Sequence, residues 1–180
     1  DWDRGGLPTE DWEALLFEAR TRADRAGHYR FAMPKELGGK DGGNLAMAVI
    51  REHLATKGLG LHNDLQNEHS IVGNNVGVLL MAEYGSAEQK KEWLPLMLEG
   101  KRGFAFGITE PAHGSDATHM ETNAVRDGDG WKINGAKTWN TGIHKAQYDM
   151  VMARTSGKAG DGDGITAFLT PLDAEGAKIE

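Results

Sequence analysis

The stretch FAFGITEPAHGSD, residues 104–116, lies where the pattern of the sequence changes. Before it, apolar residues recur at intervals of three and four, which is typical of helices. After it, short runs rich in β-branched and aromatic residues are separated by Asp-Gly and Asn-Gly pairs, which is typical of strands joined by tight turns. We therefore predict an α+β fold, with an amino-terminal helical domain over residues 1–103 and an antiparallel β-domain over residues 104–180.

The same stretch has the composition of a ligand-binding loop. An apolar strand runs into a segment that carries the hydroxyls of Thr109 and Ser115, the rigid Pro111, and Gly114, which allows another group to approach the backbone closely. On residue types alone, an ordinary turn after a strand remains the simpler interpretation, because short motifs have low specificity.

The first two helices are predicted from capping signals and apolar spacing. Thr9 is placed to cap the first helix, and Gly27 to end it; the second runs over residues 44–57 and ends before Gly58. We expect the first helix to bury Trp12, Leu15, Leu16, Ala19, Ala23 and Ala26, and the second to bury Leu45, Val49, Ile50 and Leu54.

Two further helices are expected before the β-domain. One follows from the apolar positions Val76, Leu79 and Leu80 and ends at Tyr84 and Gly85. The next begins with a capping box, in which Ser86 and Gln89 each satisfy a backbone donor, and Pro95 limits it.

Asp-Gly and Asn-Gly pairs at residues 127–130 and 134–135 supply the positive-φ positions that tight hairpins need. The first three predicted strands form an antiparallel meander around these turns. The expected strands are Glu121–Arg126, Trp131–Asn134, Lys137–Asn140, Tyr148–Arg154 and Ile165–Thr170.

Composition excludes several classes of protein. The net charge of −7 is spread along the chain, so no basic surface for nucleic acid or anionic membranes is expected. The absence of cysteine excludes disulfides, thiolate zinc sites and thiol catalysis. No apolar run approaches the roughly 18 residues that span a bilayer. We expect a globular protein located in the cytoplasm if bacterial and in the mitochondrial matrix if eukaryotic.

No metal site is predicted. Asp161 and Asp163 lie among glycines but lack the later ligands of a calcium loop, so a turn is expected there. The pairs His62 with His69 and His113 with His119 have no acidic third ligand at a matching spacing.

Two segments together resemble a known family. ITEPAHGSD, within residues 108–116, resembles the T-E-P-x-x-G-S-D signature of acyl-CoA dehydrogenases, and DGWKINGAKTWNT, residues 129–141, resembles their G-x-x-I-N-G-x-K-x-W-x-T signature. The segments MPKELGG, residues 33–39, and YGSAEQK, residues 84–90, are similar to parts of the family's helical domain. The resemblance spans nearly the whole chain and implies FAD as the cofactor.

The first signature implies a set of cofactor contacts. Phe106, Ile108 and Thr109 would line the isoalloxazine ring, with Thr109 reaching its pyrimidine end. Ser115, beside Gly114, would lie between the flavin diphosphate and the pantetheine or phosphate part of the substrate.

The second signature implies that Trp139 packs on the ring face away from the substrate and that the Thr141 hydroxyl donates to flavin N5, with Asn140 between them also at the cofactor. An aromatic wall excludes water, and a donor at N5 stabilises negative charge on the ring. Trp131, by contrast, is assigned to the core of the sheet.

The resemblance also implies that parts of the catalytic machinery lie outside these residues. The base is a glutamate expected beyond Glu180, the β-barrel is expected to be incomplete, and we expect the 180-residue chain alone to be inactive. No catalytic residue is therefore assigned. Glu110 and Asp116 are interpreted as structural, with Glu110 holding backbone amides.

The implied reaction is oxidation of an acyl-CoA thioester to the trans-2-enoyl-CoA, with an electron-transfer flavoprotein as acceptor and a homodimer or homotetramer as the assembly. The alternatives are an acyl-CoA oxidase or flavin monooxygenase on the same fold, or a flavin- or CoA-binding scaffold without turnover. The length and branching of the acyl chain are not determined by these residues.

Overall fold

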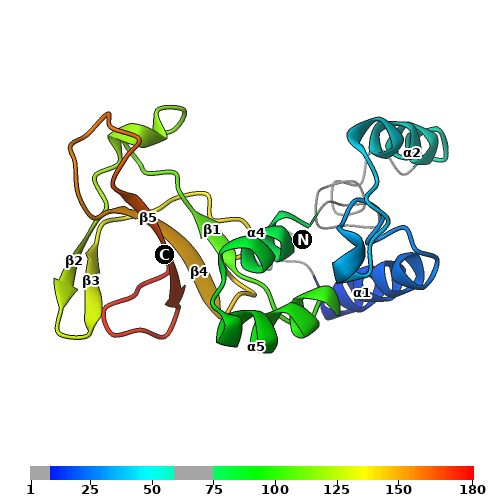
Figure 1. The fold of residues 1–180 in the computed structure, drawn as a ribbon, viewed down its shortest axis with the longest axis horizontal. Coiled ribbons are helices and arrows are strands. Elements are labelled where there is room, and N and C mark those ends of the chain that lie inside the picture. Colours follow the sequence, from blue (N-terminus) through cyan, green and yellow to red (C-terminus); the bar gives the residue numbers. More distant parts are fainter. Residues whose placement is uncertain (1–8, 59–74) are drawn as a thin grey trace. The chain divides into compact units, whose positions relative to one another are not determined.

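The computed structural model describes residues 9–58 and 75–180, so His62 and His69 lie outside the described residues. The chain divides into two compact units, Asp1–Lys101 and Arg102–Glu180. The first is helical and the second is built on a β-sheet (Figure 1). The sheet has five strands. The predicted fold class is confirmed: a helical part is followed by a β part, and the sheet does not close into a barrel.

Helix α1, Glu10–Arg25, begins as its sequence predicts. The Thr9 hydroxyl accepts from the Trp12 amide at 3.2 Å, and acidic residues in the first turn and arginines in the last complement the helix dipole. Leu16 and Ala23 are buried, but Leu15 and Ala26 are exposed. The buried stripe is therefore narrower than predicted.

Residues 33–39 contain the short 3₁₀ helix η2, Lys35–Leu37, and lead toward α2, Asn44–Thr56. The position of α2 agrees with the prediction, but its buried face does not, since Leu45 and Val49 are exposed and Met47 is the buried residue. Apolar spacing identifies a helix without showing which side its neighbours cover.

Helices α4, Val76–Tyr84, and α5, Ala87–Leu98, contact one another. The predicted capping box of α5 is confirmed: the Gln89 amide donates to the Ser86 hydroxyl at 3.2 Å, and the Ser86 amide donates to the Gln89 side chain at 2.8 Å. The expectation that Pro95 limits the helix is wrong, because α5 continues through it to Leu98.

The sheet is built around β4, Tyr148–Arg154, which is central in Figure 1. β5, Ile165–Pro171, pairs with β4 in antiparallel fashion along the whole of β4. β1, Ala105–Gly107, pairs in parallel with Asp149–Val151, and β2, Asn123–Asp127, pairs in parallel with β4 at Arg154. β3, Gly130–Asn134, completes the antiparallel hairpin with β2.

Two features differ from the predicted antiparallel meander. The sheet mixes parallel and antiparallel pairs, and the predicted strand Lys137–Asn140 is not a strand. The chain leaves β3 at Gly135, whose φ is 152° and where a Cβ would lie only 2.3 Å from the Thr122 hydroxyl oxygen. Residues 137–140 then bond to the loop after β1 instead of extending the hairpin, as the Thr138 amide donates to the Thr109 carbonyl.

The prediction that Trp131 lies in the core of the sheet is wrong. It is 38% exposed on the sheet, where its ring meets Phe168 edge-on at 5.2 Å and the Arg126 guanidinium lies 4.2 Å from its centroid. Within residues 9–58 and 75–180, none of the helices is long and apolar enough to cross a membrane.

Candidate cofactor-binding site

The two signature segments meet at one backbone hydrogen bond. The Thr138 amide donates to the Thr109 carbonyl at 2.9 Å, joining the loop after β1 to the loop after β3. This bond brings together segments that are 29 residues apart in the chain. Residues from both signatures therefore lie at one end of the sheet.

A buried ion pair reinforces this junction. The Lys137 ammonium lies 2.8 Å from the Glu110 carboxylate and donates to the Ile108 carbonyl at 3.1 Å, and both charged side chains are almost completely buried. The Glu110 carboxylate also accepts from the Glu121 and Thr122 amides at 2.7 and 2.9 Å. The expectation that Glu110 holds backbone amides is confirmed.

The charge of Glu110 is stabilised by these partners. Burial by itself would raise the pKa of this carboxyl, but the hydrogen bonds from Lys137 and from the Thr122 and Glu121 amides outweigh burial and lower the pKa to about 2. A fully bonded carboxylate of such low basicity is poorly suited to remove a proton from carbon. Glu110 is a structural residue of the site.

Two aromatic side chains are exposed beside this junction. β1 alternates, with Ala105 and Gly107 buried and Phe106 facing outward at 40% exposure. Trp139 is 84% exposed and has a φ of 62°, in the left-handed region that non-glycine residues rarely adopt. Large exposed aromatic surfaces of this kind are typical of a binding face.

The Asn140 side chain is held by Asp149, a residue that the sequence patterns did not assign to the site. Its side-chain amide donates to the carboxylate of Asp149 on β4, and both groups pack against Gly107. A Cβ on Gly107 would lie 2.6 Å from Asp149 Oδ2 and 2.9 Å from Asn140 Nδ2, so this close approach requires glycine. The sequence signal for Asp149 is an acidic residue directly before the apolar run MVMA in the strand YDMVMAR.

The remaining predicted residues have different environments. Ile108 and Thr109 are half-buried after β1, whereas Gly114, Ser115 and Thr141 are exposed. The loop that carries Ser115 turns tightly, as the Glu110 amide donates to the His113 carbonyl at 3.0 Å and the His113 amide donates back at 3.2 Å. The hydroxyl and backbone groups of the exposed residues Gly114, Ser115 and Thr141 are therefore accessible.

These residues fit the chemistry of FAD. A flavin needs flat apolar surface for its ring and hydrogen-bond donors for its polar edge and diphosphate. The exposed Trp139 and Phe106 offer the first, and the hydroxyls of Ser115 and Thr141 offer the second. The observation that supports the fit most directly is Trp139, an exposed indole on a backbone fixed in a rare conformation.

Two histidines, His113 and His119, lie near the same loop. The His113 and His119 rings stack at 6.1 Å, and His119 Nδ1 lies 2.6 Å from Asp116. A hydrogen bond from the Thr118 hydroxyl, together with His119, lowers the pKa of Asp116. Within the described residues, no group of three or more side chains is arranged to hold a metal ion.

The glycine-rich turn at residues 155–164 is organised by Arg154. The guanidinium donates to the backbone carbonyls of Asp161, Asp163 and Thr118, and the Asp161 carboxylate accepts from the Lys158 amide at 3.2 Å. Residues 159–164 form turns, as predicted for this segment, and the Arg154 guanidinium holds their carbonyls.

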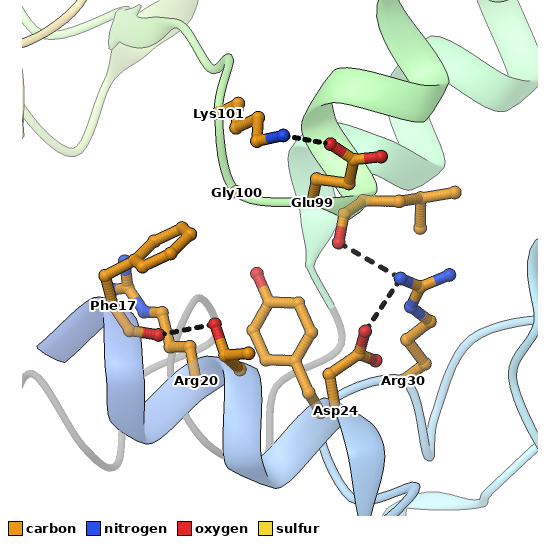
Figure 2. A pocket seen from close by; sticks show the side chains of 10 residues that line it. Phe17, Arg20, Asp24, Arg30, Glu99, Gly100 and Lys101 are labelled. Carbon is orange, nitrogen blue, oxygen red and sulfur yellow. Dashed lines mark hydrogen bonds and ion pairs between the residues drawn. The ribbon is translucent and has the colours of Figure 1, made fainter.

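A separate cavity of about 310 Å³ lies in the helical unit, between α1 and the end of α5. Figure 2 shows that its charges are largely paired internally: Arg30 donates to Asp24 at 2.8 Å and to the Leu98 carbonyl, and Lys101 pairs with Glu99 at 2.7 Å. None of the residues predicted to bind the cofactor lines this cavity.

Comparison with known proteins matches both units to one family. Residues 5–101 match the family model described as acyl-CoA dehydrogenase, N-terminal domain. Residues 105–180 match the model described as acyl-CoA dehydrogenase, middle domain.

Individual relatives agree with these matches. Acyl-CoA dehydrogenase FadE12 of Mycobacterium tuberculosis is 31% identical over 159 residues, which are 88% of this chain and 39% of FadE12. Caffeyl-CoA reductase-Etf complex subunit CarC of Acetobacterium woodii is 33% identical over 153 residues, 85% and 39% of the two chains.

A solved structure, glutaryl-CoA dehydrogenase from Mycobacterium smegmatis in complex with FADH2, matches with a TM-score of 0.65 and 29% identity over 90% of this chain and 41% of that chain. The chain thus spans about two fifths of the length of these relatives.

Proposed function

Because this chain belongs to the acyl-CoA dehydrogenase family, we propose that it supplies part of the FAD site of an enzyme that oxidises acyl-CoA thioesters to trans-2-enoyl-CoA. In this proposal residues 1–103 are part of the helical domain and residues 104–180 are part of the flavin-binding domain. The base is supplied from outside the chain, and no residue of the chain is assigned to proton removal.

Bound FAD would supply the acceptor for the β-hydrogen, which leaves as hydride when the α-hydrogen leaves as a proton. The chain's own residues bind and orient the cofactor. Phe106 and Trp139 provide apolar surface that excludes water, with Ile108, Thr109 and Asn140 beside them. The hydroxyl of Thr141 is assigned to the ring edge, and Ser115, with Gly114, to the diphosphate and the substrate.

The observation that carries this proposal is the junction of the two signature loops. The hydrogen bond between Thr138 and Thr109 and the buried pair of Glu110 with Lys137 fix the loops that carry Trp139, Thr141 and Ser115. Cofactor residues act well when their supporting groups are rigid, and this junction is buried and fully bonded around Glu110.

The proposed partners follow from the family. An electron-transfer flavoprotein is the proposed electron acceptor, and a homodimer or homotetramer is the proposed assembly. The CarC relative, whose name places it in a complex with Etf, supports association with another flavoprotein but does not identify the acceptor of this protein.

Reoxidation of the substrate-reduced flavin tests the reaction class. The native protein that contains this chain is reduced anaerobically with acyl-CoA and then mixed with air-saturated buffer or with an electron-transfer flavoprotein. Preference for the flavoprotein supports the dehydrogenase. Rapid reoxidation by oxygen supports an oxidase or monooxygenase, and bound flavin that no acyl-CoA reduces supports a scaffold without turnover.

A further inference from the structure

Trp139 has a backbone conformation that its neighbours must hold in place. Its φ of 62° is unusual for a residue with a large side chain, and the indole is 84% exposed, so packing of the described residues around it contributes little. A non-glycine residue keeps such a conformation where the surrounding structure fixes the chain on both sides. The contacts that fix the Trp139 backbone should therefore be made by the neighbouring residues Thr138 and Asn140.

Both neighbours are anchored, Thr138 to the loop after β1 and Asn140 to β4. On one side the Thr138 amide donates to the Thr109 carbonyl at 2.9 Å. On the other side the Asn140 side chain donates to the carboxylate of Asp149, while the Asn140 carbonyl accepts from the Ile143 amide at 3.1 Å. Within the described residues, Asp149 is thus the one side chain that bonds to the Asn140 side chain.

Asp149 is an unfavourable residue at this position of the strand unless it serves to hold the Asn140 side chain. It lies on β4 opposite Ala105, it is only 4% exposed, and its Oδ1 atom has no partner within the described residues. Lys137, whose charge acts on Asp149, bonds directly to Glu110 instead. A buried carboxyl with one unpaired oxygen lowers the stability of the fold, whereas an apolar residue at the same position would not have this cost.

The pKa of Asp149 is also set by opposing effects of burial and hydrogen bonding. Burial raises the pKa of this carboxyl, opposed by the hydrogen bond from Asn140, by the positive charge of Lys137 and by the backbone of Gly107. The side chain that donates a hydrogen bond to Asp149 is therefore the uncharged amide of Asn140.

We propose that Asp149 is a positioning residue of the flavin site: by holding the Asn140 side chain against Gly107, it fixes the turn that presents the Trp139 indole. The part that concerns flavin rests on the proposed function, whereas the hold on Trp139 does not. Asp149 itself touches neither cofactor nor substrate in this proposal.

The test of the hold on Trp139 uses fluorine NMR of the native protein labelled with 5-fluorotryptophan, the Trp139 signal being assigned with Trp139→Phe. In Asp149→Ala the Trp139 signal should shift or broaden while the Trp93 and Trp131 signals stay in place. Asp149→Asn retains an oxygen that can accept from Asn140 and should keep the signal near its original position.

Ala153→Gly on the same strand is the matched control, because Ala153 is fully buried on β4 and its side chain has no hydrogen-bonding group. It should lower stability without moving the Trp139 signal. If Asp149→Ala does not fold, Asn140→Ala removes the same hydrogen bond from the other side and must shift the same signal. An unmoved Trp139 signal in either variant, or an equal shift in Ala153→Gly, would overturn the proposal.

Retention of FAD separates this proposal from the function on which it depends. Asp149→Ala should release FAD about tenfold more readily, the scale of an unsatisfied buried hydrogen-bond partner, with the effect shared rather than added in the double variant with Asn140→Ala. Fully additive losses would contradict the coupling. An unmodified native protein that binds no FAD would instead refute the proposed function, and the fluorine result would still decide the hold on Trp139.

Discussion

The Lys137 ammonium lies 2.8 Å from the Glu110 carboxylate, and the two side chains are only 6% and 5% exposed. The pair joins the loop after β1 to the loop after β3, and both loops carry residues of the proposed flavin site. Its energetic role can be measured without any cofactor.

Lys137→Met should destabilise the β unit strongly. The substitution leaves Glu110 as an uncompensated buried charge, for which the expected cost is about 3–5 kcal/mol. Denaturant unfolding monitored by circular dichroism measures the loss. The control is Lys101→Met, which breaks an exposed ion pair with Glu99 and should cost at most about 1 kcal/mol. Similar losses in both variants would show that the buried pair is not a structural anchor.

Stability should fall in acid because of Glu110. Its pKa is lowered from 4.5 to about 2, so the stabilisation is fully present above pH 4.5 and is lost as the pH falls through about 2. Asp149 acts in the opposite direction: because its pKa is raised, its contribution is present below its ordinary value and is lost as the pH rises through the folded-state value. Urea midpoints measured between pH 2 and 6 should therefore decline toward acid in the parent protein.

Glu110→Gln identifies the source of this decline. The variant should be less stable at pH 6 and should have a flatter profile between pH 4.5 and 2. Glu175→Gln, at an exposed position, should leave the profile of the parent intact. A Glu110→Gln profile as steep as that of the parent would assign the acid transition to other carboxylates.

Gly107→Ala should disturb the packing of the Asp149 and Asn140 side chains against residue 107. The added methyl group would lie 2.6 Å from Asp149 Oδ2 and 2.9 Å from Asn140 Nδ2, so the two side chains must move apart. Overpacking of this kind costs about 1–3 kcal/mol, and FAD retention should fall with it. Gly103→Ala, where a Cβ meets no atom within 4 Å, is the control. Equal thermal stability of the two variants would contradict the packing described for Gly107.

Trp139→Phe separates a cofactor contact from ordinary packing. Because the indole is exposed in the described chain, stability should change by less than about 0.5 kcal/mol. The visible absorption of bound flavin, FAD retention and electron delivery to the partner flavoprotein should all change, because ring packing and solvent access change. Trp131→Phe, which alters the contact with Phe168, should instead affect stability alone. A stability loss with an unaltered flavin spectrum would remove Trp139 from the site.

The sequence predicts local structure well where the cause is local. The Thr9 cap, the Ser86 capping box and the bounds of β4 are each set by a few adjacent residues, and the structure agrees with all three. Pro95 breaks the same reasoning, because α5 continues past the backbone donor that proline lacks. Tertiary packing can outweigh a local penalty of that size.

The parts that sequence patterns could not supply depend on long-range contacts. Residues 137–140 look like a strand, but the close approach of Gly135 to Thr122 and the bond from Thr138 to Thr109 make them a loop. The role of Asp149 likewise depends on Asn140, nine residues earlier, and on Gly107 in a neighbouring strand. Family signatures identify which segments matter without showing what holds them.

The proposed function is tested most directly by an anaerobic spectrophotometric titration of the purified native protein that contains this chain. We expect a yellow protein with FAD bound, whose visible absorption is bleached by a saturated acyl-CoA as an equivalent amount of trans-2-enoyl-CoA forms. Absence of bound flavin, or flavin that no saturated acyl-CoA bleaches, would contradict it.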